Sequence, residues 1–213
     1  MTKPHYWDEA TRVLAERDPV LRKLIAATPG LHLTRRGDPF TTLARAIVGQ
    51  QISVKAAQSI WERLVAACGG ASSTPVVLDP ARVQRKRIAT LRKLGLSERK
   101  AEYIRDLARH FVSARLDPGK WPSLDDEALI DALVDVKGIG RWTAEMFLMF
   151  HEMRADVLPV DDLGLQKAMA LHYFDGERPT LAALRELAEK WRPYRSVATW
   201  YLWRSMDPIP VEY

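Results

Sequence analysis

Two neighbouring aspartates, Asp161 and Asp162, follow the apolar run Leu158-Pro159-Val160 and precede a segment with helical spacing. A carboxylate in a water-poor site can stabilise positive charge that develops during a reaction, and it can orient or deprotonate a water molecule. Aspartates in this position are also common helix caps, because their oxygens accept N–H groups of the first turn. Both roles remain open for this pair, and the residue types alone do not choose between the two aspartates.

The segment 133–144 is a second candidate for chemistry, because two apolar helical runs meet there at Gly138 and Gly140. Two glycines one residue apart permit a tight turn and the close approach of a partner. The N–H groups that open the second helix lack partners within it, and together with the helix dipole they attract phosphate whatever the base sequence. Lys137 and Arg141 would add positive charge. A plain connection between two helices also often contains glycine, so the spacing leaves both interpretations open.

Most of the chain carries the start signals and apolar spacing that are typical of helices. The predicted caps, two of them followed by proline, are Asp18, Ser53, Asp79, Ser97 and Ser123 with Asp126. No segment alternates apolar and polar residues for long enough to build a sheet. The sequence therefore predicts an all-α fold, in which one helix and one loop separate the glycine turn from Asp162. Such a connection can bring the carboxylate back toward a nucleic acid held by the turn.

The composition limits the classes of function. The chain has 213 residues, of which 47% are hydrophobic and 28% charged, as in globular proteins, and its formal net charge is +5. A moderate basic excess fits a polyanionic partner without being specific to one. The single cysteine, Cys68, excludes an internal disulfide, a four-cysteine zinc site and a cysteine-bound iron–sulfur cluster, and it indicates a reducing compartment. No signal-peptide pattern and no run of about eighteen apolar residues occurs, so we expect no membrane association.

A run of basic residues lies between positions 82 and 100 and is interrupted by Glu98. Its members are Arg82, Arg85, Lys86, Arg87, Arg92, Lys93, Arg99 and Lys100. Such a run is usually a solvated face. It could equally follow a DNA backbone and make binding dependent on salt.

The string from Leu133 to Ala144, LVDVKGIGRWTA, resembles the helix-hairpin-helix motif of DNA-binding proteins, with Lys137 in place of the usual proline. The aspartate segment 159–166 and three further stretches extend the resemblance: Arg45–Ser53, Leu94–Ile104, and Lys190–Ser196 followed by Trp203. From about residue 40 to its end, the chain is similar to the helix-hairpin-helix (HhH-GPD) DNA glycosylase superfamily. The most similar branch is the 3-methyladenine DNA glycosylase II (AlkA-like) group, here without the N-terminal β domain of larger members.

The resemblance implies one glycosylase domain over residues 1–213, built from two helical lobes with a cleft between them. The middle lobe would span about 53–150 and include the hairpin 133–144 at the cleft mouth. The N- and C-terminal parts would form the other lobe, with Asp162 buried inside the cleft.

The resemblance also implies roles for individual residues. The catalytic carboxylate would be the second aspartate, Asp162. The expected DNA-backbone contacts are Gly138, Gly140 and Thr143, with charge from Lys137 and Arg141, and a cation could bind the backbone carbonyls of Val134, Val136 and Ile139. The base pocket would contain Trp142, Met146 and Trp203. The wedge that fills the space left by a flipped base would be Gln51, with Gln50 beside it. Trp142 occupies the position of the lysine that strand-cleaving relatives use, so the expected enzyme is monofunctional.

The implied reaction is hydrolysis of the N-glycosidic bond of alkylated purines, of the 3-methyladenine and 7-methylguanine type, in double-stranded DNA. The base would be flipped out of the duplex and an abasic site left for base excision repair. An alkylated purine is cationic and leaves as a neutral base, so one carboxylate can suffice where sugar glycosidases commonly use two. We expect no required cofactor, although a structural monovalent or other cation could bind at the hairpin. We also expect a monomer and an intracellular location, in the cytoplasm and nucleoid or in the nucleus if the source is eukaryotic.

Two alternatives remain open. A non-catalytic helix-hairpin-helix module would bind DNA through the same turn and basic surface but would not need Asp162 or an aromatic pocket. A glycosylase for neutral bases such as hypoxanthine or uracil would need an added general acid, and no residue of the sequence stands out for that role.

Overall fold

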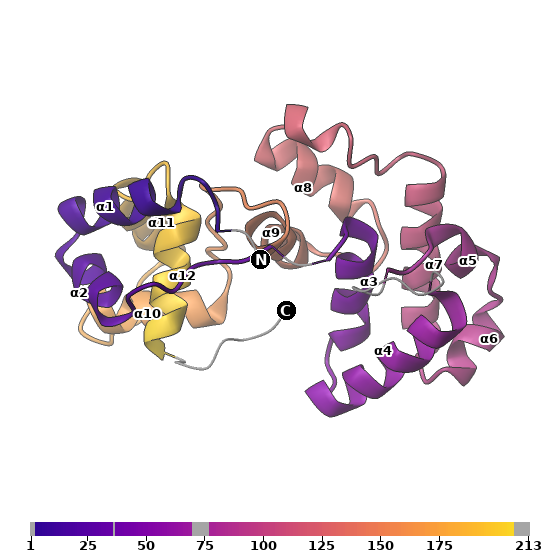
Figure 1. Cartoon of the computed structure of the whole chain (residues 1–213). Helices are drawn as coiled ribbons and strands as arrows, with labels where there is room; N and C mark the ends of the chain where they lie inside the picture. Colours follow the sequence, from indigo (N-terminus) through magenta and orange to yellow (C-terminus); the bar gives the residue numbers. More distant parts are fainter. Residues whose placement is uncertain (1–2, 36, 70–76, 207–213) are drawn as a thin grey trace. The chain divides into compact units, whose positions relative to one another are not determined.

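The computed structural model describes residues 3–35, 37–69 and 77–206, which fold into α-helices (Figure 1). The helices are α1 (Trp7–Arg17), α2 (Pro19–Ala27), α3 (Pro39–Gly49), α4 (Val54–Cys68), α5 (Pro80–Arg85), α6 (Ile88–Lys93), α7 (Glu98–Val112), α8 (Asp126–Val134), α9 (Arg141–Phe150), α10 (Leu163–Tyr173), α11 (Leu181–Glu189) and α12 (Arg195–Met206), with a short 3-10 turn at Trp121–Ser123. No described residue lies in a β-strand, and one isolated antiparallel bridge joins Gly69 to Leu78. The predicted all-α class is confirmed. Within the described ranges, no helix has the length and apolar character that crossing a membrane requires.

Four of the predicted caps begin helices, and the side chain of each accepts an N–H group of the first turn: Asp18 for α2, Ser53 for α4, Asp79 for α5 and Ser97 for α7. The predicted cap at Ser123 is wrong. The Ser123 hydroxyl donates to the carbonyl of Lys120 (2.7 Å) within the 3-10 turn. Asp125 caps α8 instead, by accepting the N–H of Ala128 (2.7 Å).

The chain divides into two compact units. The central unit is the continuous segment Arg36–Phe147, and the terminal unit combines the described residues up to Arg35 with those from Leu148 onward. Figure 1 shows α1 and α2, in indigo, grouped with α10 to α12, in orange and yellow, although most of the sequence separates them. Helix α3, which the sequence left outside the middle lobe of about 53–150, belongs to the central unit.

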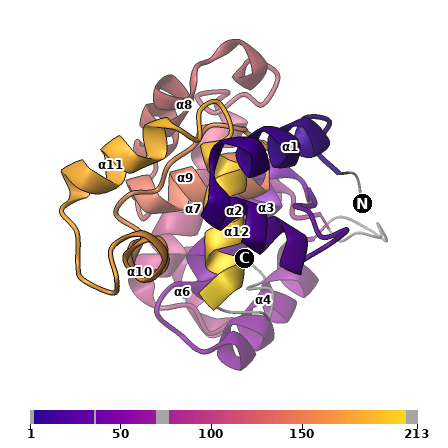
Figure 2. The same ribbon diagram turned by 90° about the vertical axis from the view of Figure 1, so that its left-hand side faces the viewer.

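Helix α12 is the centre of the terminal unit. Its residues from Ser196 to Leu202 are all buried, as expected of a helix enclosed by other helices. Helices α1, α2 and α10 pack against it, and Figure 2 looks onto this unit with these helices around α12. Trp7 of α1 meets the ring of Trp200 edge-on, with 5.2 Å between ring centroids. This packing fixes the end of α12 that carries Trp203.

Helix α7 has the corresponding role in the central unit, where α3, α5 and α6 pack against it. A series of edge-on aromatic contacts runs across this unit, from Phe40 of α3 through Phe111 of α7 and Trp121 to Phe147 of α9. The successive centroid distances are 5.3, 6.2 and 5.5 Å, within the range of favourable ring pairs. Trp121 thus connects α7 and α9 through its contacts with Phe111 and Phe147.

A buried carboxylate ties the terminal unit together. Asp18 is fully buried, and its Oδ1 accepts the N–H of Val20 (2.9 Å) as the cap of α2. Its Oδ2 accepts from the Tyr173 hydroxyl (2.9 Å), the Trp191 indole N–H (2.8 Å) and the Lys190 ammonium (3.0 Å). Burial alone would raise the pKa of Asp18, but these hydrogen bonds outweigh it and hold the pKa below its ordinary value.

Replacing Asp18 with asparagine should lower the free energy of unfolding by about 2 kcal/mol at pH 7, because hydrogen bonds to a charged acceptor are lost. A depressed folded-state pKa stabilises the protein above the unfolded-state value of about 3.9 and ceases to do so as the pH falls through the folded-state value. The difference between wild type and Asp18→Asn should therefore be constant near neutrality and shrink below about pH 4. Urea unfolding at pH 7, 5 and 3 measures it, and a difference that does not change with pH would contradict the assignment.

Candidate functional site

The predicted hairpin is present: α8 and α9 are joined by a tight turn that contains both glycines. Gly138 has φ of 84°, and a Cβ added there would lie 2.2 Å from the Tyr103 ring of α7. Only glycine fits this position, for both conformational and steric reasons. Gly140 differs, because its φ is not in the left-handed region and an added Cβ would meet nothing within 4 Å. The fold therefore requires glycine at 138, and it leaves open space in front of 140.

Helix α7 also anchors the turn through a buried carboxylate. The Asp106 Oδ2 accepts the backbone N–H of Lys137 (3.0 Å), while its Oδ1 is paired with Arg109. The Lys137 N–H is thus used inside the fold, whereas the Lys137 side chain is exposed. Sequence reasoning missed Asp106, because nothing in its local pattern distinguishes it from other polar helix residues.

Arg141, at the start of α9, is engaged by two carboxylates. It donates to both oxygens of Glu127 (2.6 and 2.9 Å) and to Glu145 Oε1 (3.0 Å), and Glu145 is buried. The hydrogen bonds that Arg141 donates to Glu127 keep the pKa of Arg141 above its ordinary value. A phosphate could recruit this guanidinium only by competing with both partners. The predicted phosphate contact at Arg141 therefore needs a displacement that sequence reasoning did not foresee.

The structure also places the expected phosphate contact Thr143 and the backbone carbonyls that were expected to bind a cation. Thr143 lies half-buried in the first turn of α9, beside the helix start. The carbonyl of Val136 accepts the N–H of Ile139 (3.1 Å), which leaves one of its lone pairs for a cation. Val134 is exposed at the end of α8. A cation at this turn would share the Val136 carbonyl with the Ile139 N–H. The described residues contain no cluster of three or more His, Cys, Asp or Glu side chains that could hold a metal ion.

The loop after α3 separates the two wedge candidates. Gln50 is half-buried and its Nε2 donates to the carbonyl of Gly138 (2.9 Å), which ties the loop to the hairpin turn. Gln51 is exposed and has φ of 57°, an uncommon conformation for a residue with a side chain. Only Gln51 is presented outward, and the loop that presents it is strained.

Asp162 is at the same time a helix cap and a held carboxylate. Its Oδ1 accepts the N–H of Leu165 (2.7 Å) at the start of α10 and the indole N–H of Trp203 (2.8 Å). Its neighbour Asp161 is exposed. Asp162 is half-buried within its own unit, where the resemblance implied a buried carboxylate. The structure thus distinguishes two aspartates that the sequence could not, because only Asp162 receives a side chain from a distant helix.

The surroundings of Trp203 explain how it reaches the carboxylate. The indole stacks on Phe150, with 5.9 Å between centroids and 13° between ring planes. Gly164 makes room for the contact, since an added Cβ would lie 3.1 Å from Asp162 Oδ1 and 3.4 Å from the indole. Sequence reasoning missed Phe150 and Gly164, and the one available signal was a glycine in the first turn of a predicted helix.

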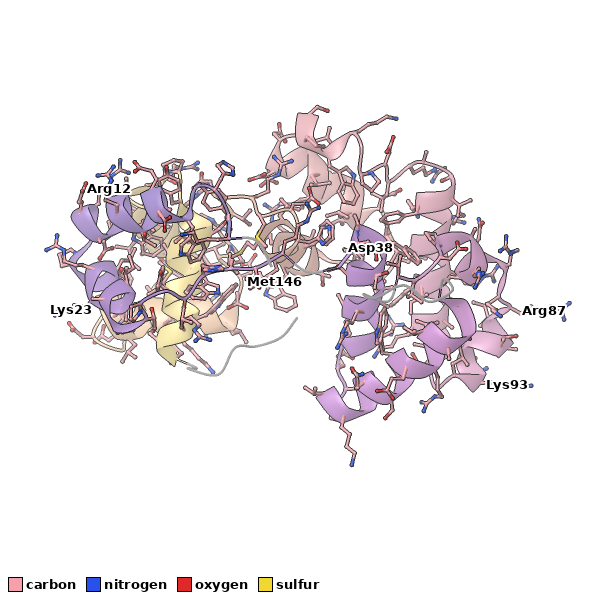
Figure 3. All side chains as sticks on the ribbon, viewed as in Figure 1. Arg12, Lys23, Asp38, Arg87, Lys93 and Met146 are labelled. Atoms are coloured by element: carbon pink, nitrogen blue, oxygen red, sulfur yellow. The ribbon has the colours of Figure 1, made fainter. Side chains whose placement is uncertain are left out.

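The other two expected pocket residues lie together on α9, in the central unit. Trp142 and Met146 are four residues apart, so they occupy the same face of the helix. Trp142 is 40% exposed, an unusual value for so large an apolar side chain. Met146, labelled in Figure 3, is only 5% exposed. The structure brings Asp162 and Trp203 together in one unit, and Trp142 and Met146 together in the other.

The basic run between 82 and 100 is divided in the structure. Arg87 and Lys93 extend outward (Figure 3), whereas Arg82 donates to the carbonyl of Gly69 (2.6 Å). Lys100 is turned inward and donates to two backbone carbonyls at the end of α3. The run is therefore not a uniform phosphate-binding face.

Comparison with known proteins gives consistent matches. Residues 44–193 match the family model of the HhH-GPD superfamily base excision DNA repair proteins. The chain is 32% identical over 172 residues to the putative DNA-3-methyladenine glycosylase YfjP of Bacillus subtilis, covering 79% of this chain and 59% of that protein. This chain thus spans less than two thirds of the length of that relative.

Solved structures of proteins named as 3-methyladenine glycosidase or glycosylase also match this chain. A DNA-3-methyladenine glycosidase from Bacillus halodurans superposes with a TM-score of 0.85 at 35% identity, covering 97% of this chain and 93% of that one. The 3-methyladenine DNA glycosylase Mag1 of Schizosaccharomyces pombe, solved in complex with abasic DNA, superposes with a TM-score of 0.76 at 29% identity, covering 92% of this chain and 96% of that one.

Proposed function

Because this chain belongs to the HhH-GPD superfamily of base excision DNA repair proteins, we propose that it is a DNA glycosylase that releases alkylated purines from double-stranded DNA. The observation that carries the proposal is the Asp162 carboxylate, held on Oδ1 by the Leu165 N–H and the Trp203 indole. The similarity to proteins named as 3-methyladenine glycosylases supports the substrate class. DNA is accordingly the macromolecular partner, and we propose that the protein acts as a monomer.

The reaction starts with a duplex gripped at the hairpin. The N–H groups at the start of α9, around Gly140 and Thr143, would hold phosphate oxygens, and the open space at Gly140 allows a backbone to come close. The target nucleotide leaves the stack at a cost of a few kcal/mol. Gln51, the exposed tip of its loop, would occupy the vacated space. Damaged bases, which pair weakly, are extruded most readily.

Bond cleavage needs only one carboxylate. The glycosidic bond of a cationic alkylated purine breaks with its electron pair moving to the base, which leaves neutral. The Asp162 carboxylate stabilises the positive charge that develops on the deoxyribose. Water then adds its oxygen to C1′ and gives up a proton, for which the same carboxylate is a suitable acceptor. The exposed face of Trp142 suits a cationic base, since cation–π contact contributes up to about 2 kcal/mol when desolvated.

The expected product is an abasic site in an intact strand. Trp142 stands two residues after Gly140, where strand-cleaving relatives have a lysine, so a Schiff base with the sugar would not form from this position. Incubation with duplexes containing 7-methylguanine, 3-methyladenine or hypoxanthine tests the proposal. We expect free methylated purine and strand breakage only after alkaline treatment. Release of hypoxanthine alone would favour a neutral-base glycosylase, and binding without any release would favour a non-catalytic module.

Replacing Trp203 with phenylalanine should slow base release by about tenfold, because a hydrogen bond to a charged group contributes about 1.5–3 kcal/mol. The aromatic ring and its stacking on Phe150 are kept, while the indole N–H that reaches Asp162 is lost. Phe150→Leu is the matched comparison, because it removes the stacking partner and leaves the N–H in place. Single-turnover rates with 7-methylguanine duplex measure both variants. Equal rates for Trp203→Phe and wild type would show that the indole N–H does not position the carboxylate.

A further inference from the structure

Lys100 occupies a position that its own helix does not favour. It lies in the first turn of α7, where the positive end of the helix dipole disfavours a cation. Its ammonium instead donates to the carbonyls of Val48 (2.8 Å) and Gln50 (2.6 Å). These carbonyls close the C-terminal end of α3, where the dipole favours a positive charge. The side chain is therefore directed across the unit toward the loop that carries Gln51.

The same loop is tied on its other side to the hairpin. The Gln50 side chain donates to the carbonyl of Gly138, whose Cα packs against the Tyr103 ring. Tyr103 and Asp106 both come from α7, as Lys100 does, and successive members are three residues apart. Such spacing places all three on neighbouring positions of the helix surface. One side of α7 thus holds the loop through Lys100 and the hairpin turn through Tyr103 and Asp106.

We propose that Lys100 is a positioning residue that fixes the backbone of the loop so that Gln51 projects as a wedge in register with the hairpin. The inference rests on the proposed function, since it assigns the loop its role in base extrusion. Gln51 is in a left-handed conformation, and the two carbonyls that Lys100 holds, those of Val48 and Gln50, lie just before it and keep the loop from relaxing. Gripping a phosphate at the hairpin and inserting the wedge then become movements of one rigid part.

The other role for a lysine in this basic run is contact with a DNA phosphate. The geometry opposes it, because Lys100 is half-buried and its ammonium makes two short hydrogen bonds inside the fold. Burial lowers the pKa of Lys100, as expected for a cation removed from water. The two roles predict different results: a phosphate contact contributes to affinity for any duplex and to its salt dependence, whereas a positioning residue affects wedge insertion.

The test uses a duplex that carries a tetrahydrofuran abasic analogue with 2-aminopurine opposite it, whose fluorescence reports disturbance of the stack. Wild type, Lys100→Met, Gln51→Ala and the double variant are compared, and Lys23→Met, an exposed lysine of α2 in the other unit, is the matched control. We expect Lys100→Met to weaken the insertion signal about tenfold or more, close to Gln51→Ala. The double variant should be no weaker than Gln51→Ala, and affinity for undamaged duplex should stay within about twofold of wild type.

Reduced affinity for undamaged duplex with a shallower salt slope and a normal insertion signal would overturn the proposal and make Lys100 a phosphate contact. A normal signal in Gln51→Ala would overturn it as well, because there would be no wedge to position. If Lys100→Met does not fold, Gln50→Ala is measured in its place, because it removes the hydrogen bond from the loop to the Gly138 carbonyl. Normal insertion in Gln50→Ala would then refute the rigid link. Base release in the product assay is read separately, so failure of the glycosylase proposal is distinguishable from failure of this one.

Discussion

Asp162→Asn is expected to reduce the rate of base release by about 10²–10³-fold, the usual loss when one preorganised electrostatic group is removed. Asparagine has nearly the same shape, and its side-chain oxygen can still accept from the Leu165 N–H and the Trp203 indole. The cap of α10 and the indole contact are therefore kept, and only the charge is lost. In the proposed mechanism, the deoxyribose cation would lose its stabilisation and the attacking water would lose Asp162 as its proton acceptor.

Single-turnover release of 7-methylguanine measures the rate, and a gel-shift titration with the same duplex should give an unchanged affinity. Asp161→Asn is the matched control, because this neighbour is exposed and should retain the wild-type rate. An undiminished rate in Asp162→Asn would end the catalytic assignment. Equal losses in both variants would point to a general effect of negative charge in the segment.

Gly138→Ala is expected to disrupt the hairpin and to lower affinity for damaged and undamaged duplexes by about 100-fold. A residue with a side chain pays roughly 1–2 kcal/mol in the left-handed conformation, and Gly138 has φ of 84°. The added Cβ would also lie 2.2–2.7 Å from three atoms of the Tyr103 ring, and such overpacking typically costs about 1–3 kcal/mol. The turn must therefore shift, and the N–H groups at the start of α9 shift with it.

Gly140→Ala separates two reasons for glycine in this turn: the packing of the fold itself and the space needed by a bound DNA backbone. Its Cβ would meet nothing within the chain, so the melting temperature should match that of wild type, whereas the melting temperature of Gly138→Ala should fall. Affinity should still decrease if a DNA backbone approaches this position closely. Thermal unfolding followed by duplex titration gives both quantities. A Gly138→Ala protein that melts and binds like wild type would show that the turn tolerates a side chain there.

Local signals predicted much of the fold. Capping residues such as Asp18 and Ser97 act on N–H groups a few positions away, so the sequence contains both members of each interaction. The failure at Ser123 is of the same kind, since a competing turn just before the helix used its hydroxyl. The family resemblance is confirmed by the match over residues 44–193.

Contacts between distant segments could not be predicted in this way. Trp203 reaches Asp162 across 41 positions, Lys100 reaches Gln50 across 50, and Trp191 reaches Asp18 across 173. No periodicity or spacing encodes such partners, because packing of whole helices determines them. The pairing of Arg141 with Glu127, 14 positions away, belongs to the same class. Glu145 differs, because it lies four residues after Arg141 on the same helix, a spacing that favours an ion pair.

The terminal unit is built from two segments that the ribosome makes at different times, because the central unit lies between them in the sequence. Translation delivers α1 and α2 before the whole central unit, whereas their packing partner α12 is made after that unit. The continuous central unit can fold while the ribosome is still working, since domains generally fold as units during synthesis. The first two helices can pack on each other meanwhile, but the apolar surface that contacts α12 stays uncovered until that helix has been made. Chaperone dependence and aggregation during expression should therefore be governed by α1 and α2, not by the α8–α9 hairpin.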